Sequence, residues 1–350
     1  MLKSFVSNLT DNRYQLLLVP SYRFELNMNK LLTIGIPTFN RAQLLDKQLT
    51  WLAKAIKGFE SDCEIFISDN CSTDNTQEVI KKWQIILSNI TFTSNKNSEN
   101  IGVMGNIACC LKAATSEYVW TIGDDDPIQE KTLNYVLKTL KKHSDLALMF
   151  LNFSGRQKRT GQLVVERWLN SDNDEPRVDG KAVFQGYLNE NFGGVLFISA
   201  AIYRTDLVQR AVQKWPSATN NLASQAYWTG FCAAHGSVIV TKDIYLECTM
   251  GASLLDLDPT WNFRMRYAYI PEVYIKLLRV GYPHKFCQEM IWQNFQQKTD
   301  RKILLGALKR WPFLTIKIFI HYLRLLSISA WAILFPPKQL ETSTARLKST

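Results

Sequence analysis

Three clusters of polar side chains follow three apolar segments, and each contains residues that could bind a ligand. The clusters are Pro37-Thr38-Phe39-Asn40-Arg41, Ser68-Asp69-Asn70-Cys71-Ser72-Thr73-Asp74-Asn75-Thr76 and Gly123-Asp124-Asp125-Asp126. One polar loop after a strand carries little information. Three such loops at one edge of a parallel sheet would line a site, because parallel strands point their carboxyl ends the same way.

The third cluster indicates a divalent cation. Three consecutive carboxylates repel one another unless a cation neutralises them, and oxygen ligands suit hard ions such as Mg²⁺ and Mn²⁺. A metal held there could bridge a diphosphate and offset the charge on a departing nucleotide. The simpler alternative makes Asp126 the cap of a helix that begins at Pro127, with the other two carboxylates facing solvent. Because the other two polar loops would lie at the same edge of the sheet, we prefer the metal site to the helix cap.

Asp69 and Arg41 each have a binding interpretation and a structural one. A carboxylate at the end of a buried strand can accept a hydrogen bond from a nucleobase ring N–H, which disfavours a base that lacks it. The alternative for Asp69 is a helix cap, although Ser72, Thr73 and Asp74 are nearer to the next helix. Arg41 could contact a phosphate or lie on a helix surface, and the sequence leaves both open.

The elements that must position these clusters alternate between strand and helix patterns. Apolar runs typical of buried strands cover residues 31–36, 64–68, 90–93, 117–122 and 146–153, with helical spacing between them, and the helix after 117–122 is expected to begin at Asp126. Repeated strand–helix units predict an α/β fold with a mostly parallel sheet and helices on both faces.

The pattern changes after residue 155. Residues 156–180 read as a long polar loop, 195–203 and 237–241 as strands, and 272–280 and the stretch from 284 onward as helices. The apolar segment 312–335 carries Lys317, His321 and Arg324 on one helical face, which is too polar for a comfortable membrane span. It suits a helix lying in a membrane interface, or one packed on the domain, and we expect residues 309–338 to contact an anionic membrane.

Composition limits the classes of function. The chain has 350 residues, 46% hydrophobic residues and a net charge of +10, which favours anionic partners, although a solvated lysine face would give the same excess. Its 7 cysteines form no C-x-x-C pair or Cys/His cluster, which argues against zinc and for reduced thiols in the cytosol. Residues 1–30 carry charges unlike a secretory signal and are expected to be an extension.

The motifs, taken in order, resemble the family 2 glycosyltransferases, and more narrowly their abequosyltransferase-like bacterial branch. The resemblance rests on Ile34–Arg41, Ile67–Thr76, Asn97–Asn106 and Tyr118–Asp126, and more weakly on Gly193–Tyr203. It implies a GT-A fold, a nucleotide-sugar donor and Mn²⁺ or Mg²⁺. It also implies a saccharide or lipid-linked acceptor, as in surface polysaccharide or lipopolysaccharide synthesis at the inner face of the cytoplasmic membrane.

The resemblance also assigns roles to residues of this chain. Asp126 would hold the metal with Asp124, Asp69 would read the base, and Asp125 would lie near the ribose. The other donor-binding residues implied are Pro37, Thr38, Asn40, Arg41, Asn70, Asn100, Gly102, Asn106 and Asp124. The resemblance further divides the chain into an extension (1–30), a nucleotide-sugar-binding half (31–155), an acceptor-side half (156–260) and a basic helical region (261–350).

Two departures from the family pattern concern the chemistry. Gly123 stands where the family usually has the first Asp of its metal motif, with Asp124 beside it. An acceptor-side catalytic Asp is expected near 216–226, yet no Asp or Glu occurs between Asp206 and Asp243. A base must reach the acceptor hydroxyl, and His235, Asp256 and Asp258 are the candidates, none of which the sequence selects.

Other classes of nucleotide-binding protein fit less well. A G-x-G-x-x-G or G-x-x-x-x-G-K-[ST] loop is absent from the sequence, which argues against a dinucleotide oxidoreductase and a P-loop kinase. A nuclease would need a basic helix with interleaved aromatics near the carboxylates, so we expect no nucleic acid partner. A non-catalytic module that binds nucleotide or a partner stays open, because the acceptor-side carboxylate is missing.

Overall fold

The first half of the chain alternates strand and helix, as the periodicity predicts. The computed structural model describes residues 30–251, 259–296 and 298–334. The elements of the first half are β1 (Leu32–Thr38), α1 (Ala42–Ala55), β2 (Cys63–Asp69), α2 (Thr76–Ile86), β3 (Thr91–Lys96), α3 (Val103–Ala113), β4 (Tyr118–Thr121), α4 (Thr132–Lys142) and β5 (Leu146–Gln157).

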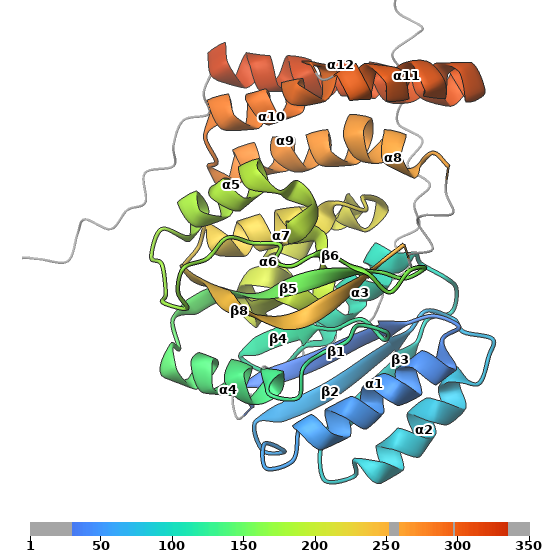
Figure 1. Cartoon of the computed structure of the whole chain (residues 1–350), viewed down its shortest axis with the longest axis vertical. Coiled ribbons are helices and arrows are strands. Elements are labelled where there is room, and N and C mark those ends of the chain that lie inside the picture. The colour runs from blue at the N-terminus through green and yellow to red at the C-terminus, as the bar shows by residue number, and fades with distance from the viewer. Residues whose placement is uncertain (1–29, 252–258, 297, 335–350) are drawn as a thin grey trace, which may run out of the picture.

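The second half of the domain adds strands to the same sheet. Its elements are β6 (Leu163–Val165), α5 (Gly180–Glu190), the 3₁₀ turns η1 (Phe192–Leu196) and η2 (Ile198–Ala200), β7 (Ala201–Arg204), α6 (Thr205–Lys214), η3 (Pro216–Asn220), α7 (Ser224–Ala233) and β8 (Ser237–Met250). The strand order is β3-β2-β1-β4-β7-β5-β6, and β8 pairs with β5. β7 runs antiparallel to both of its neighbours, so the sheet is mixed. It is otherwise mostly parallel, and helices cover both of its faces, as expected (Figure 1).

The register of the sheet brings two of the polar clusters to one level. Thr38 at the end of β1 pairs with Asp69 at the end of β2, and Thr121 at the end of β4 pairs with Gly35. Asp124 follows Thr121 by three residues, as Thr38 follows Gly35, so the third cluster extends to the same level. Buried apolar side chains fill β1 and β4, which fixes this register because a slip would expose them.

Two local expectations were wrong. The helix expected at Asp126 begins only at Thr132, because Ile128 instead forms a β-bridge with Leu246 and Gln129 donates to the Tyr245 carbonyl. The strand expected over 195–203 is mostly the two turns η1 and η2, and only its last residues enter β7. Asp126 is therefore not a helix cap.

The C-terminal region is helical. It comprises α8 (Trp261–Arg264), the π-helical turn η5 (Met265–Tyr269), α9 (Ile270–Val280), α10 (His284–Gln296), α11 (Lys298–Arg310) and α12 (Pro312–Leu334). Figure 1 shows these helices stacked beyond α5 and α7, with α11 and α12 farthest from the sheet. Residues Pro312–Ala330 of α12 are long and apolar enough to cross a membrane by length and composition, a property that core helices share.

One carboxylate joins the first two helices to the loop after β2. Asp74 accepts a hydrogen bond from the backbone N–H of Ala42 at the start of α1 (3.0 Å). Its other oxygen accepts from the N–H of Thr76 at the start of α2 (3.1 Å). Asp74 thus satisfies backbone donors that both helices would otherwise leave unpaired.

Asp74→Ala should lower the free energy of unfolding by about 2 kcal/mol, because both helix starts lose a capping acceptor. Urea denaturation measures the change. Glu99→Ala is the matched control, since Glu99 is an exposed carboxylate of a nearby loop, and it should leave stability nearly unchanged. Equal stability of the two variants would contradict the capping role.

Candidate functional site

An arginine joins the first and third polar clusters at the carboxyl edge of the sheet. One guanidinium nitrogen of Arg41 lies 3.0 Å from a carboxylate oxygen of Asp124 and 3.0 Å from one of Asp125. The Thr38 hydroxyl donates to the other Asp124 oxygen at 2.7 Å. Asp124 is 4% exposed, so its charge is sheltered from water and neutralised by Arg41. The sequence interpretation that these loops meet holds for these four residues.

Asp126 is held by a residue from the second half of the domain. The Ser199 hydroxyl in η2 donates to Asp126 Oδ2 and accepts from the Gly123 N–H at 2.8 Å. The Ser199 carbonyl accepts from the Trp120 indole N–H at 2.7 Å. A Cβ on Gly123 would collide with the Asp126 carboxylate. Glycine at this position therefore leaves room for the carboxylate that follows it.

The electrostatics of the cluster favour a cation. Burial raises the pKa of Asp126 to about 7, and the charges of Asp125 and Asp124 add to this rise, while the Ser199 hydrogen bond opposes it. Burial also raises the pKa of Asp124, against the hydrogen bond from Thr38 and the charge of Arg41. Arg41 contacts Asp124 and Asp125, whereas Asp126 forms no ion pair with a basic side chain among the described residues.

Asp126 fits a divalent cation better than Asp124 does. Both Asp124 oxygens already accept hydrogen bonds from Thr38 and Arg41, whereas Asp126 Oδ1 has no hydrogen-bond donor among the described side chains. Within the described residues, no group of three or more His, Cys, Asp and Glu side chains could hold a metal alone. Mg²⁺ commonly binds through one or two carboxylates plus substrate phosphates, and Asp126 suits that arrangement.

The asparagines of the central motif form a hydrogen-bonded network under the site. Asn106 in α3 accepts from the Ser68 hydroxyl (2.7 Å) and from Asn97 (3.1 Å), and donates to the Ser68 carbonyl (2.9 Å). Asn70 donates to Asn100 at 2.8 Å and accepts from Asn97 at 3.2 Å. Asn70 and Asn106 are both 3% exposed. These two residues, which the resemblance places in the donor-binding set, join the ends of β1, β2 and β3 to α3.

Two exposed members of the predicted donor set belong to the same framework. Asn100 accepts a hydrogen bond from the N–H of Gly102. Gly102 directly precedes α3 and has a φ of 77°. Asn40, with a φ of 52°, accepts from the N–H of Thr73 at 2.8 Å, and its own N–H donates to Ser72. A non-glycine residue in this left-handed region carries strain that the bonds offset.

Asp69 is completely buried. Its two oxygens accept from the N–H of Ser72 at 2.8 Å and from the side-chain amide of Gln77 at 2.6 Å. A nucleobase could reach this carboxylate only by displacing one of these two donors. The Gln77 side chain is the one to be displaced, because it is partly exposed. The sequence predicts no role for Gln77 or Ser199, because nothing marks either residue except its position near a motif.

Of the three candidate bases, His235 is the one that the structure describes. His235 lies two residues before β8 begins, at the opposite edge of the sheet from Asp124, since β8 runs parallel to β5. Its ring stacks on Phe231 at 4.2 Å, and Nδ1 lies 2.6 Å from the Phe231 carbonyl oxygen. This placement removes His235 as the base, because it cannot reach an acceptor at the carboxyl edge. Asp256 and Asp258 lie outside the described residues.

Asn106→Ala should lower the free energy of unfolding by about 2–4 kcal/mol, because Ser68 and Asn97 lose partners in a buried setting. Asn189→Ala, the same change at an exposed helical position, is the control. Urea denaturation compares the two. A loss no larger than that of the control would show that the network contributes little to stability.

The raised pKa of Asp126 predicts a pH dependence of stability in metal-free buffer. The folded state holds the Asp126 proton more tightly than the unfolded chain, so this contribution falls as pH rises from about 4 to about 7. Asp126→Asn keeps a neutral side chain, so it should be more stable than the native chain at pH 8, with the difference vanishing near pH 4. A constant difference across urea titrations at several pH values would contradict the shift.

Comparisons with known proteins show what part of the chain is similar to, in sequence and in fold. The sequence pattern of the family "Glycosyl transferase family 2" matches residues 33–184. Abequosyltransferase RfbV of Salmonella typhimurium is 30% identical over 185 residues, which are 50% of this chain and 53% of that protein. The chain therefore spans about half the length of this relative.

Two solved structures have a similar fold. Staphylococcus aureus TarS 1–349 in complex with UDP-GlcNAc superposes with a TM-score of 0.60 at 17% identity, over 85% of this chain and 81% of that one. Mannosyltransferase PcManGT from Pyrobaculum calidifontis, in complex with GDP-Man and Mn²⁺, has a TM-score of 0.50 at 14% identity, over 89% of each chain. This chain thus has the GT-A fold of these solved structures, and its residues 33–184 match the sequence pattern of glycosyl transferase family 2.

Proposed function

We propose that this protein transfers a sugar from a nucleotide-sugar donor to a saccharide or lipid-linked saccharide acceptor, in bacterial surface polysaccharide or lipopolysaccharide synthesis. One observation carries the proposal: Thr38, Arg41 and the Asp124–Asp126 cluster meet at the carboxyl edge of the sheet, beside Asp69. Ligands of open α/β sheets bind at that edge. The family match supports the transferase chemistry, although fold alone would not.

The donor would lie across the three loops. Arg41, a quarter exposed and held by two carboxylates, would face the diphosphate, and Thr38 and Asp124 would fix the orientation of its guanidinium. Pro37 and Asn40 shape the first loop, and Asn70, Asn100, Gly102 and Asn106 build the framework below it. Asp69 would read the nucleobase after displacement of Gln77, and Asp125 would lie near the ribose.

Asp126 would hold Mn²⁺ or Mg²⁺ together with the donor phosphates, with Asp124 as a second ligand if Thr38 and Arg41 release it. When bound, the cation would offset negative charge on the departing nucleoside diphosphate. The Ser199 hydroxyl keeps the Asp126 carboxylate in one orientation, and Gly123 leaves the space for it. Asp256 and Asp258 are retained as candidate bases, since they follow Met250, which ends β8 at the carboxyl edge.

The second candidate function is a non-catalytic nucleotide-binding protein. The absence of an Asp or Glu from residues 207–242 favours it, because the acceptor half then lacks a carboxylate in the window where a base is expected. The two functions differ in turnover. Hydrolysis or transfer of the donor sugar in Mn²⁺ supports the transferase, whereas tight nucleotide binding without turnover supports the alternative.

The location follows from the acceptor and the C-terminal helices. We propose that the protein is cytoplasmic and contacts the inner face of the cytoplasmic membrane through residues 309–338. Within that range, α12 exposes Phe313, Ile316 and Ile320 beside basic residues, as expected of a helix in a membrane interface.

Nucleotide binding tests the donor site. One nucleoside diphosphate from a panel should raise the melting temperature in Mn²⁺, and chelation should remove the effect, because a ligand of the native state adds about 2.7 kcal/mol at 100-fold excess over its Kd. Asp126→Asn should lose the Mn²⁺-dependent part. Asp172→Asn, an exposed carboxylate outside the site, should keep it.

If no nucleotide of the panel raises the melting temperature, the donor-site interpretation is wrong. A response that Asp126→Asn retains in full would instead reject Asp126 as the metal ligand while leaving nucleotide binding intact.

A further inference from the structure

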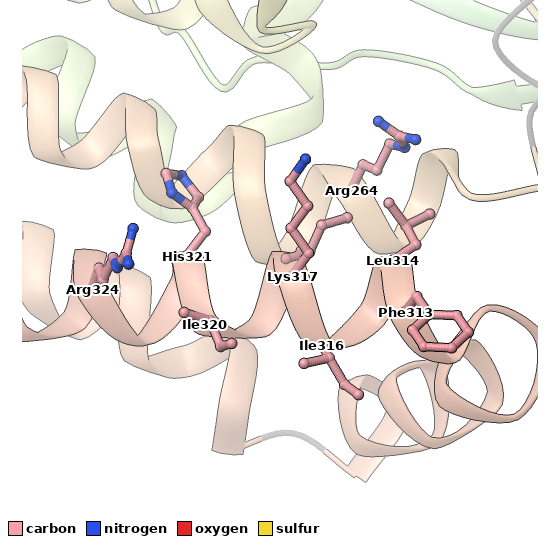
Figure 2. Close-up of a pocket in the computed structure, with 9 residues that line it drawn as sticks. Arg264, Phe313, Leu314, Ile316, Lys317, Ile320, His321 and Arg324 are labelled. Atoms are coloured by element: carbon pink, nitrogen blue, oxygen red, sulfur yellow. The ribbon is translucent and has the colours of Figure 1, made fainter. Parts of the chain in front are cut away.

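An open groove of about 700 Å³ runs along α12 where this helix crosses α8. Figure 2 shows Arg264 of α8 and Lys317, His321 and Arg324 of α12 along it, with Phe313, Ile316 and Ile320 projecting from the neighbouring face of α12. The lining contains four basic residues and no carboxylate. This composition suits an anionic ligand.

The basic side chains of the groove have little else to neutralise them. Lys317, His321 and Arg324 are exposed, and none pairs with a carboxylate in the part of the chain that the structure describes. Arg264 donates its Nε–H to the Thr260 hydroxyl at 2.8 Å, which orients the guanidinium and leaves its terminal N–H groups for a ligand. Arginine binds phosphate oxygens through two such groups at once.

An exposed apolar row adjoins the basic row on α12. Phe313 is 89% exposed, Ile316 52%, Ile320 48% and Leu323 48%. The third row of the helix, Ile318, Tyr322 and Leu325, is buried against the other helices. With about 100° between successive residues, the apolar row flanks the basic row and does not oppose it.

We propose that this groove binds the phosphate headgroup of an anionic phospholipid, with the exposed apolar row of α12 entering the outer acyl region. The inference rests on the proposed membrane contact and adds the site and its ligand. A soluble anion would use the basic row alone and leave four large apolar side chains in water. A lipid matches both rows, because its phosphate lies next to its hydrocarbon.

The groove also sets how the enzyme would face the membrane. Its Arg264 end belongs to α8, the first helix after β8, and β8 ends at the carboxyl edge of the sheet. Figure 1 shows α8 on the side of the molecule where the loops after β1 and β2 lie. With α12 seated on a leaflet, these loops would therefore lie at the side of the molecule, on the same side as the Arg264 end of the groove.

Vesicle flotation tests the site. The full chain should bind phosphatidylcholine vesicles that contain phosphatidylglycerol far better than phosphatidylcholine alone. Lys317→Gln combined with Arg324→Gln should weaken this binding roughly 30-fold, at about 1 kcal/mol for each cation near the surface. Lys138→Gln combined with Lys142→Gln on α4 makes the same change in net charge far from the groove and should bind like the native chain.

Three results would overturn the proposal: equal binding by the groove and α4 variants, equal binding of the native chain to both vesicle types, or release by inorganic phosphate at the concentration of the lipid phosphate, which would identify a free-anion site. Ile316→Ser with Ile320→Ser gives a second variant and should weaken binding without altering charge. Nucleotide stabilisation in Mn²⁺ without vesicles should be unchanged in every variant. Its absence from the native chain would reject the proposed function while leaving the vesicle result standing.

Discussion

The site depends on keeping three negative charges together where the sheet excludes water. At a separation of 4 Å, two unit charges in a setting of intermediate polarity interact by about 4 kcal/mol, so the cluster needs compensation. Arg41 supplies it for Asp124 and Asp125, and its reach requires β1 and β4 to end at one level. The repulsion on Asp126 is not offset by Arg41, and burial together with this repulsion raises the pKa of Asp126. The register of the sheet and the chemistry of the loops are thus one constraint.

The loops around this charge are rigid because polar groups satisfy one another below it. Asn106 links three strand ends to α3, and Asp74 links the starts of α1 and α2 to the loop after β2. Such buried networks hold a single geometry when every member is paired. A donor would therefore meet a framework that is largely formed before it binds, in which Gln77 is the partly exposed side chain that must move for a base to reach Asp69.

The sequence predicts the parts of this protein that depend on local pattern. The strands from 31 to 153, the helices after residue 270 and the meeting of Thr38, Arg41 and Asp124 follow from periodicity and from the direction of parallel strands. The framework contacts of Asn70 and Asn106 do not, because an asparagine that binds a ligand and one that joins two strands look alike in a sequence; their role in donor binding stays a prediction. Ser199 was invisible for a different reason: its contact with Asp126 joins residues 73 positions apart.

That long-range contact makes the two halves of the domain non-interchangeable. A chimaera that joined the loop after β4 to the second half of a relative's domain would keep Asp126 oriented only if the incoming turn carried a hydroxyl at the position of Ser199. It would also need a carbonyl placed to receive the Trp120 indole. The turn η2 and the loop after β4 are therefore structurally coupled and would have to be exchanged together.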